Sequence, residues 1–408
     1  MRAASILAAI GLASLTGGSA AAAQSAGAAR SDLAGTCRDA RESHGPGRTS
    51  SHTSINDSRR DEARWTVSFS SGACSLEVRA RGELRFNRDV TDLESVASGG
   101  YFEIETDDGD LRRRLEVRPE GGGLERLYYV NGRSRDFDAE GRAWLAVALV
   151  ELDRRTAFAA KWRVPRILEA RGVDGVLDEI SRMTADYARR IYFTTLLDSA
   201  RLDPAAVRRA LTQVGRELGS DYERAELLIA FAKRTTLDDA ARLAYTEAAD
   251  GISSDYEHRR ALSALLETGT PNRATVDAVL RSATRIGSDY ELATLLIAVT
   301  SRDLVDDATR AAYFGAVATV DSDYEQRRAL SALLARKGLS RELVAAVVRA
   351  GADGIASDYE LATLLVSVAQ GYPMDDTLRT AYLRAVDTIG SDHEHRRAMS
   401  ALENRAAR

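Results

Sequence analysis

The chain has 408 residues, of which 44% are hydrophobic and 29% charged, and its formal net charge is only -5. This length exceeds one ordinary core and suits two domains, or one domain with an extended array. Because charges of both signs are interspersed, nucleic acid and anionic membranes are not expected partners.

The first residues have the pattern of a secretory signal. Arg2 precedes an apolar stretch, residues 3–15, and small residues then run to Ala23, just before Gln24. This pattern predicts a signal peptide over residues 1–23 and a periplasmic or secreted protein. No later stretch approaches the roughly 18–20 apolar residues that a membrane span needs, so no span is expected.

Residues 24–64 are rich in Ser, Gly, Arg, Asp and Ala and nearly lack bulky apolar side chains. Such a segment buries too little surface to offset its ordering entropy, which predicts a disordered tether. The chain has two cysteines, Cys37 and Cys74. In an oxidising compartment they favour a disulfide that ties this tether to the region that follows.

From Trp65 the apolar residues alternate with polar ones, as they do in Trp65, Val67 and Phe69. A period of two indicates half-buried strands. Residues 65–139 are therefore predicted to form an antiparallel β meander of about six short strands. The turn signals between its later runs are Asp108-Gly109, Gly121-Gly122-Gly123 and Asn131-Gly132.

Acidic residues cluster near one of these turns, at Glu103, Glu105, Asp107, Asp108 and Asp110. Oxygen ligands of this kind suit calcium, but their spacing does not match a calcium-binding loop. The two glutamates fit the polar face of a strand instead. No metal site is predicted.

From Glu140 the apolar period becomes helical, which predicts a helical connector over residues 140–185. A repeat then runs to the end of the chain, and its aspartates recur every 34 or 35 residues, at Asp186, Asp221, Asp255, Asp289, Asp323, Asp358 and Asp392. Such a period, with two apolar-periodic stretches in each unit, indicates stacked helical hairpins. The predicted fold class is α+β: a small N-terminal β meander followed by an α-solenoid over residues 186–408.

Most repeats begin with a serine, followed three residues later by glutamate, which is the pattern of a capping box. In this interpretation the serine hydroxyl accepts from the amide of the glutamate, and the glutamate side chain reaches back to the serine amide. The aspartate between them suits the positive end of the helix dipole. The predicted boxes are Ser220 and Glu223, Ser254 and Glu257, Ser288 and Glu291, Ser322 and Glu325, Ser357 and Glu360, and Ser391 and Glu394.

A tyrosine occupies the second position of most of these helices and lies about 120° from the leucine stripe. We expect it to pack on the neighbouring repeat.

The repeats alternate between two types, so the full period is about 68 residues. One type carries arginine pairs, at Arg259-Arg260, Arg327-Arg328 and Arg396-Arg397. The second arginine of each pair lies away from the leucine stripe and is expected to be substantially exposed. Two interpretations stay open: ion pairs with the box glutamates, or a row of guanidinium groups that binds carboxylates or phosphates of an extended partner.

No phosphate-binding glycine loop, nucleophile elbow or zinc-protease motif occurs in the sequence. The chain has only five histidines, which leaves little material for acid–base or metal catalysis. We therefore expect no enzymatic activity and no cofactor.

The boxed repeat and the Arg-Arg-Ala-Leu units resemble the α-helical, HEAT-like repeat regions of bacterial envelope proteins. The Ser-Asp-Tyr-Glu runs are similar to those accompanying sensor metallopeptidases of the antirepressor-signalling type. The resemblance covers residues from Asp186 onward and implies a sensing or scaffold module. Those peptidases also carry a zinc motif and membrane helices, which are missing from this sequence, so no catalytic residue carries over.

Two functions follow as hypotheses. The first is an exported scaffold that binds a protein or peptide of the cell envelope through the surface of its repeats. The second is a small-ligand binder or enzyme that uses the β domain and its junction with the helices.

Overall fold

The computed structural model describes residues 50–56, 64–71, 74–302, 304–306 and 308–406. These residues form two compact units, which divide between Asp153 and Arg154. The described part of the first unit holds the strands and one helix, and that of the second unit holds helices alone.

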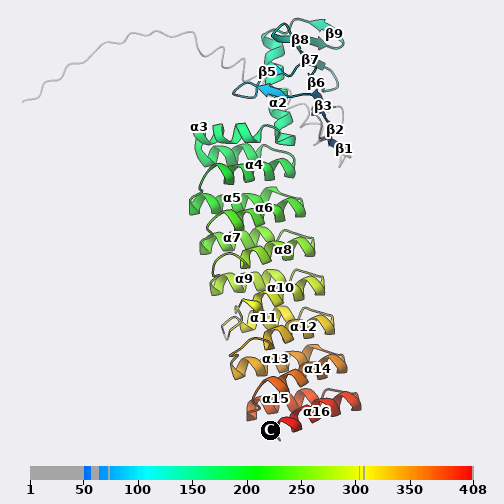
Figure 1. Ribbon diagram of the computed structural model, residues 1–408, viewed down its shortest axis with the longest axis vertical. Coiled ribbons are helices and arrows are strands. Elements are labelled where there is room, and N and C mark those ends of the chain that lie inside the picture. Colours follow the sequence, from blue (N-terminus) through cyan, green and yellow to red (C-terminus); the bar gives the residue numbers. More distant parts are fainter. Residues whose placement is uncertain (1–49, 57–63, 72–73, 303, 307, 407–408) are drawn as a thin grey trace, which may run out of the picture. The chain divides into compact units, whose positions relative to one another are not determined.

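The first unit is built on a seven-stranded antiparallel sheet (Figure 1). Its strands pair in the order β1-β2-β3-β6-β7-β8-β9, and the separate hairpin of β4 and β5 is inserted between β3 and β6. The strands are β1 (Ser50–Asn56), β2 (Arg64–Ser71), β3 (Cys74–Arg81), β4 (Leu84–Phe86), β5 (Leu93–Val96), β6 (Tyr101–Asp107), β7 (Arg112–Glu120), β8 (Gly123–Val130) and β9 (Arg133–Arg135).

One face of this sheet forms the core of the first unit. Because side chains alternate across a strand, Phe102 and Ile104 share the inner face, and neither has exposed surface. Helix α2 (Ala139–Thr156) packs on this face through Trp144, whose indole N–H donates to the Thr106 hydroxyl at 2.9 Å. The opposite face carries the charged residues of β3, β6 and β7.

The predicted antiparallel β meander is confirmed, but the described residues hold nine strands where about six were expected, and the sheet begins earlier than the sequence indicated. Ser50–Asn56 lies within the predicted tether, yet it forms β1 and pairs with β2 at the edge of the sheet. An edge strand is held by backbone hydrogen bonds, which do not require bulky apolar side chains, so composition did not reveal it. The predicted signal peptide and most of the predicted tether lie outside the described residues.

The hairpin between β8 and β9 shows how local sequence determines this meander. Val130 pairs with Arg133 across a two-residue turn. The turn residues Asn131 and Gly132 have φ values of 49° and 75°. Positive φ at both positions is the condition that favours Asn-Gly in tight hairpins, and the predicted turn is confirmed.

The second unit is an array of stacked helices (Figure 1). The helices with even numbers contact one another in sequence, and those with odd numbers form a second column. The helices are α3 (Ala160–Ser181), α4 (Asp186–Ser199), α5 (Pro204–Glu217), α6 (Asp221–Arg234), α7 (Asp239–Ala249), α8 (Asp255–Leu266), α9 (Arg273–Ala283), α10 (Asp289–Ser301), α11 (Arg310–Val317), α12 (Asp323–Leu334), α13 (Arg341–Gly354), α14 (Asp358–Gly371), α15 (Asp376–Val386) and α16 (Asp392–Ala406).

The even helices from α4 to α16 each begin at the aspartate of the repeat motif, and the predicted α-solenoid is confirmed. Its start differs from the prediction. Residues 140–185 were expected to form a connector, but α2 lies mostly in the first unit, whereas α3 packs on α4 and α5. Helix α3 bends at Gly172, where φ is 65°, a conformation that glycine adopts without strain.

Of the two hydrogen bonds expected in each capping box, the structure shows the one that the serine hydroxyl accepts. Each box serine accepts from the amide of its glutamate at 3.4 Å, which is long for a hydrogen bond. The expected return contact from glutamate to serine amide is wrong for the boxes whose serine amides have another acceptor. In Ser220, Ser254, Ser322, Ser357 and Ser391, this amide donates to the aspartate of the preceding repeat.

We call this contact the aspartate clamp. The carboxylate of Asp323, for example, accepts from the amides of Ala356 and Ser357, both at 2.9 Å. These two amides lead into α14, so one carboxylate ties the start of one even helix to the start of the next. The same arrangement starts from Asp186, Asp221, Asp289 and Asp358, while Asp255 accepts from Gly287.

The aspartate clamp gives the first prediction. Asp323→Asn leaves one oxygen for two amides and should lower the free energy of unfolding by about 1–3 kcal/mol. Urea unfolding measures the total, and hydrogen exchange should quicken first at Ala356 and Ser357. Asp353→Asn, at an exposed position of α13, is the matched control. Equal stability and exchange in both variants would contradict the clamp.

Candidate binding surface

A row of exposed tyrosines follows the column of even helices. Each is the second residue of its helix, directly after the clamp aspartate. We call the set the tyrosine ladder; the exposed fractions are Tyr187 48%, Tyr222 53%, Tyr256 51%, Tyr290 57%, Tyr324 51% and Tyr359 58%. About half of each residue faces solvent, so the expected packing on the neighbouring repeat is partial: the rings of Tyr290 and Tyr359 contact an arginine of the next repeat.

Arginines and box glutamates form ion pairs beside the tyrosine ladder. The second arginine of each pair bonds the glutamate of its own repeat, as Arg260 does with Glu257 at 2.6 Å and Arg397 with Glu394 at 2.8 Å. The first arginine reaches the glutamate of the next repeat, as in Arg259 with Glu291. The other ion pairs are Arg190 with Glu223, Arg327 with Glu360 and Arg328 with Glu325.

These ion pairs account for the two alternating repeat types. Because the first arginine reaches the glutamate of the next repeat and the second bonds that of its own repeat, one arginine pair serves two box glutamates. Arg260 also reaches back to Glu226 of the preceding repeat. The pKa values reflect these ion pairs: the hydrogen bond that Arg260 donates to Glu226 raises the pKa of Arg260, and the one that Arg397 donates to Glu394 lowers the pKa of Glu394. A charge-assisted contact explains why the box glutamates turn toward arginine instead of their serine amides.

The expectation that the second arginines are substantially exposed is wrong. The side chains of Arg260, Arg328 and Arg397 are 27%, 29% and 34% exposed. Those of Arg259 and Arg327 are 20% exposed. Arg396 differs: it is exposed and has no ion pair among the described residues, and no described helix follows α16 to supply a glutamate.

The guanidinium groups also lie over the tyrosine rings. Arg259 is 5.3 Å from the ring centre of Tyr256, and Arg397 is 5.4 Å from that of Tyr359. Arg328 lies 5.6 Å from Tyr290 and 6.0 Å from Tyr324. One cation therefore contacts the rings of two successive repeats, which places these tyrosines side by side along the array.

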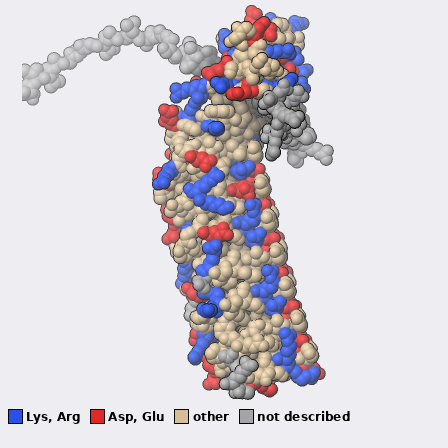
Figure 2. Space-filling model, in the orientation of Figure 1, with Lys and Arg blue, Asp and Glu red and all other residues tan. Residues whose placement is uncertain are grey.

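The charges on this surface are closely balanced. Figure 2 shows basic and acidic atoms interspersed along the edge of the solenoid that carries the even helices. Each arginine of the three predicted arginine pairs except Arg396 has a carboxylate partner. The surface thus offers aromatic rings and hydrogen-bonding groups without a strong field of one sign.

The composition of the repeats distinguishes the tyrosines from their neighbours. The fourth residue of each even helix from α6 to α16, two positions after the tyrosine where there is one, faces inward. It is Arg224, His258, Leu292, Gln326, Leu361 or His395. All but His395 are buried. The solenoid therefore accepts four residue types at an inward position. At the exposed position, where packing places little demand on the side chain, it has tyrosine in every even helix from α4 to α14, and His393 in α16.

A second set of tyrosines is buried and was missed in the sequence. Tyr245, Tyr313 and Tyr382 have no exposed surface. Their hydroxyls donate to the backbone carbonyls of Ala261, Ala329 and Ala398 at 2.9, 3.0 and 2.8 Å. Each bond joins an odd helix to the following arginine-bearing helix. The Ala-Tyr pairs that recur in α7, α11 and α15 are the signal that sequence reasoning overlooked.

One buried polar group lies between α8 and α9. His258 Nε2 is 2.9 Å from the hydroxyl of Ser282, which in turn donates to Asp250. His258 and Ser282 are 1% and 2% exposed, so no substrate reaches them. Burial lowers the pKa of His258, although Asp250, Asp255 and Asp221 favour its charged form while Arg285 opposes it.

The lowered pKa of His258 predicts a pH dependence of stability. Below about pH 6.5 the unfolded chain binds a proton that the folded chain resists. The free energy of unfolding should therefore fall between about pH 7 and pH 5. His258→Leu should flatten this slope, because leucine occupies the same site at Leu292 and Leu361. Urea unfolding across pH measures both proteins, and identical slopes would rule out this role.

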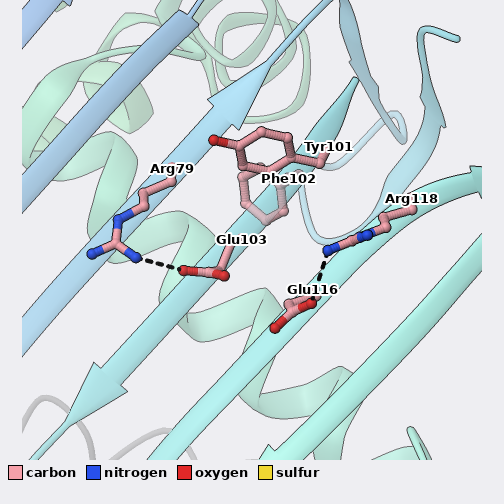
Figure 3. A pocket seen from close by; sticks show the side chains of 6 residues that line it. All are labelled: Arg79, Tyr101, Phe102, Glu103, Glu116 and Arg118. Atoms are coloured by element: carbon pink, nitrogen blue, oxygen red, sulfur yellow. Dashed lines mark hydrogen bonds and ion pairs between the residues drawn. The ribbon is translucent and has the colours of Figure 1, made fainter. Parts of the chain in front are cut away.

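The outer face of the β unit contains the other candidate site (Figure 3). A hollow of about 250 Å³ is lined by Arg79, Tyr101, Phe102, Glu103, Glu116 and Arg118. Arg79 pairs with Glu103 at 3.2 Å, and Arg118 with Glu116 at 3.5 Å. Its charges are thus satisfied within the sheet.

The acidic residues near the turn after β6 have a structural role. The carboxylate of Asp108 accepts from the amides of Asp110 and Leu111, and that of Asp107 accepts from Gly109. These bonds hold the turn between β6 and β7. Among the described residues, no cluster of three or more His, Cys, Asp or Glu is placed to hold a metal ion.

Cys74 begins β3, is buried and takes part in a disulfide. Cys37, the other half of the predicted bridge, lies outside the described residues. Within the described part of the chain, no helix combines the length and apolar character needed to cross a bilayer.

No protein-family model, curated protein or solved structure matches the chain.

Proposed function

We propose that the protein is an exported, non-catalytic interaction scaffold that binds a protein or peptide of the cell envelope through its tyrosine ladder. The observation that carries this proposal is the recurrence of six tyrosines, each 48–58% exposed, at one position of successive repeats. Exposed tyrosines supply apolar contact area and a hydroxyl with only two side-chain torsions to order, which suits protein recognition.

The arginines support the tyrosines in this proposal. Since their guanidinium groups are paired with box glutamates, a partner that bound them as free cations would have to displace existing ion pairs. Their contacts with the rings hold the tyrosines in place instead. Arg396 is the remaining exposed cation of the predicted row and suits a supplementary contact.

The chemistry of the described residues favours binding over catalysis. In the group of His258, Ser282 and Asp250, burial closes the first two side chains to substrates. The hollow on the β unit has charges that are already paired and lacks a histidine. A small ligand at that hollow remains the second candidate function, favoured by the position of Tyr101 beside the two ion pairs (Figure 3).

A capture experiment with matched variants tests the proposal. The full chain, the variant Tyr256→Ala/Tyr290→Ala/Tyr324→Ala and Trp162→Ala are immobilised and exposed to an envelope extract of the source organism. Trp162 is the control because it is 50% exposed and aromatic but lies on α3, outside the ladder. Proteins held by the wild type and by Trp162→Ala should be depleted at least roughly tenfold on the triple variant, because several aromatic contacts are lost together.

Equal capture by all three proteins, measured by quantitative mass spectrometry, would contradict the role of the ladder. A fourth variant, Glu103→Gln/Glu116→Gln, separates the second candidate. Loss of binding in that variant, with the triple tyrosine variant unaffected, would assign recognition to the β unit.

A further inference from the structure

We infer that the tyrosine ladder binds an extended, proline-rich polypeptide in the polyproline II conformation, which runs along the stack and crosses successive even helices. This inference rests on the proposed function and specifies the chemistry of the partner. Three features of the ladder support it: the spacing of its rings, the pairing of its charges and the hydrogen-bond donors that it presents.

The spacing of the ladder matches the period of a polyproline II helix. Neighbouring even helices pack directly on one another, and packed helices lie roughly 8–10 Å apart. The position of Arg328 between Tyr290 and Tyr324 agrees with such a step, since it lies within 6.0 Å of both ring centres. A polyproline II chain has three residues per turn and rises about 3.1 Å per residue, so one of its faces recurs every 9 Å or so.

The paired charges exclude a strong preference for an acidic or a basic partner. Arg260 is held between Glu257 and Glu226, both at 2.6 Å, and Arg397 between Glu394 and the hydroxyl of Thr363. The ring surfaces that remain are aromatic and uncharged. Aromatic-lined grooves are the surfaces on which proline-rich segments dock.

Hydrogen bonding also favours a proline-rich chain. Proline has no backbone N–H, and a polyproline II helix has no internal hydrogen bonds, so such a chain presents carbonyl acceptors with few donors. The ladder offers matching donors in the hydroxyl groups of its half-exposed tyrosines. Donors on the protein thus meet acceptors on the ligand.

A ladder of repeated weak contacts predicts binding that depends on ligand length. A preformed polyproline II chain loses little conformational freedom on docking. Each additional turn engages one more tyrosine without a new association step, so affinity should rise with length. A fifteen-residue chain extends roughly 45 Å and would reach about five rings.

The test measures fluorescence anisotropy of labelled oligoprolines of 6, 9, 12 and 15 residues with the full-length protein. Affinity should increase with length, and a fifteen-residue Gly-Ser peptide should bind far more weakly. Tyr256→Ala/Tyr290→Ala/Tyr324→Ala should weaken the longest oligoproline by roughly tenfold or more. The matching Tyr→Phe triple variant keeps the rings but removes the hydroxyl donors, so it should lose less affinity than the alanine variant but bind more weakly than the wild type. Trp162→Ala should keep all of the affinity.

Three outcomes would overturn this inference: no oligoproline binding at millimolar protein, equal binding of the Gly-Ser peptide, or equal loss in the Trp162→Ala variant. If envelope capture of proteins still depends on the tyrosines in such a case, the ladder binds a partner of other chemistry, such as a folded protein, and the proposed function stands. If envelope capture is also independent of the tyrosines, both proposals fail.

Discussion

The carboxylate of the motif aspartate connects each repeat to the next. In Asp323 it accepts two backbone amides that precede the following even helix, at 2.9 Å each. The start of a helix carries unsatisfied amides and positive dipole charge, so an anion placed there is stabilising. Since the contact always runs from one repeat to its successor, it sets how adjacent hairpins align and makes the array approximately a sum of nearest-neighbour terms.

The arrangement of the other motif residues follows from this contact. With the serine amide bonded to aspartate, as Ser357 is to Asp323, the glutamate is available to pair with arginine, as Glu360 does with Arg327. With the first helical residue turned toward the next repeat, the second residue faces outward, where Tyr290 is 57% exposed. Buried tyrosines such as Tyr313 join the helices instead. The charged residues of the motif thus hold adjacent repeats together, while its tyrosine is available to contact a partner.

The sequence was sufficient to predict the fold class and the helix starts, because the 34-residue period and the capping serines can be recognised without knowing which repeats are in contact. It was insufficient where contacts cross repeats. The clamp of Asp323, the forward reach of Arg259 and the hydroxyl contact of Tyr313 each join residues at least 16 positions apart, and local periodicity carries no information about them. For the same reason the exposure of Arg260 was overestimated. Strand β1 was missed because an edge strand has no apolar signature.

The central claim is that the exposed tyrosines do not hold the fold together, whereas the buried ones do. Urea unfolding followed by circular dichroism compares Tyr256→Ala/Tyr290→Ala/Tyr324→Ala with single Tyr245→Ala and Tyr313→Ala variants. Each ladder substitution should change the free energy of unfolding by less than about 1 kcal/mol. Each buried substitution should lower it by about 3–5 kcal/mol. A loss per residue in the ladder as large as that at the buried sites would contradict the account and make the ladder a part of the scaffold.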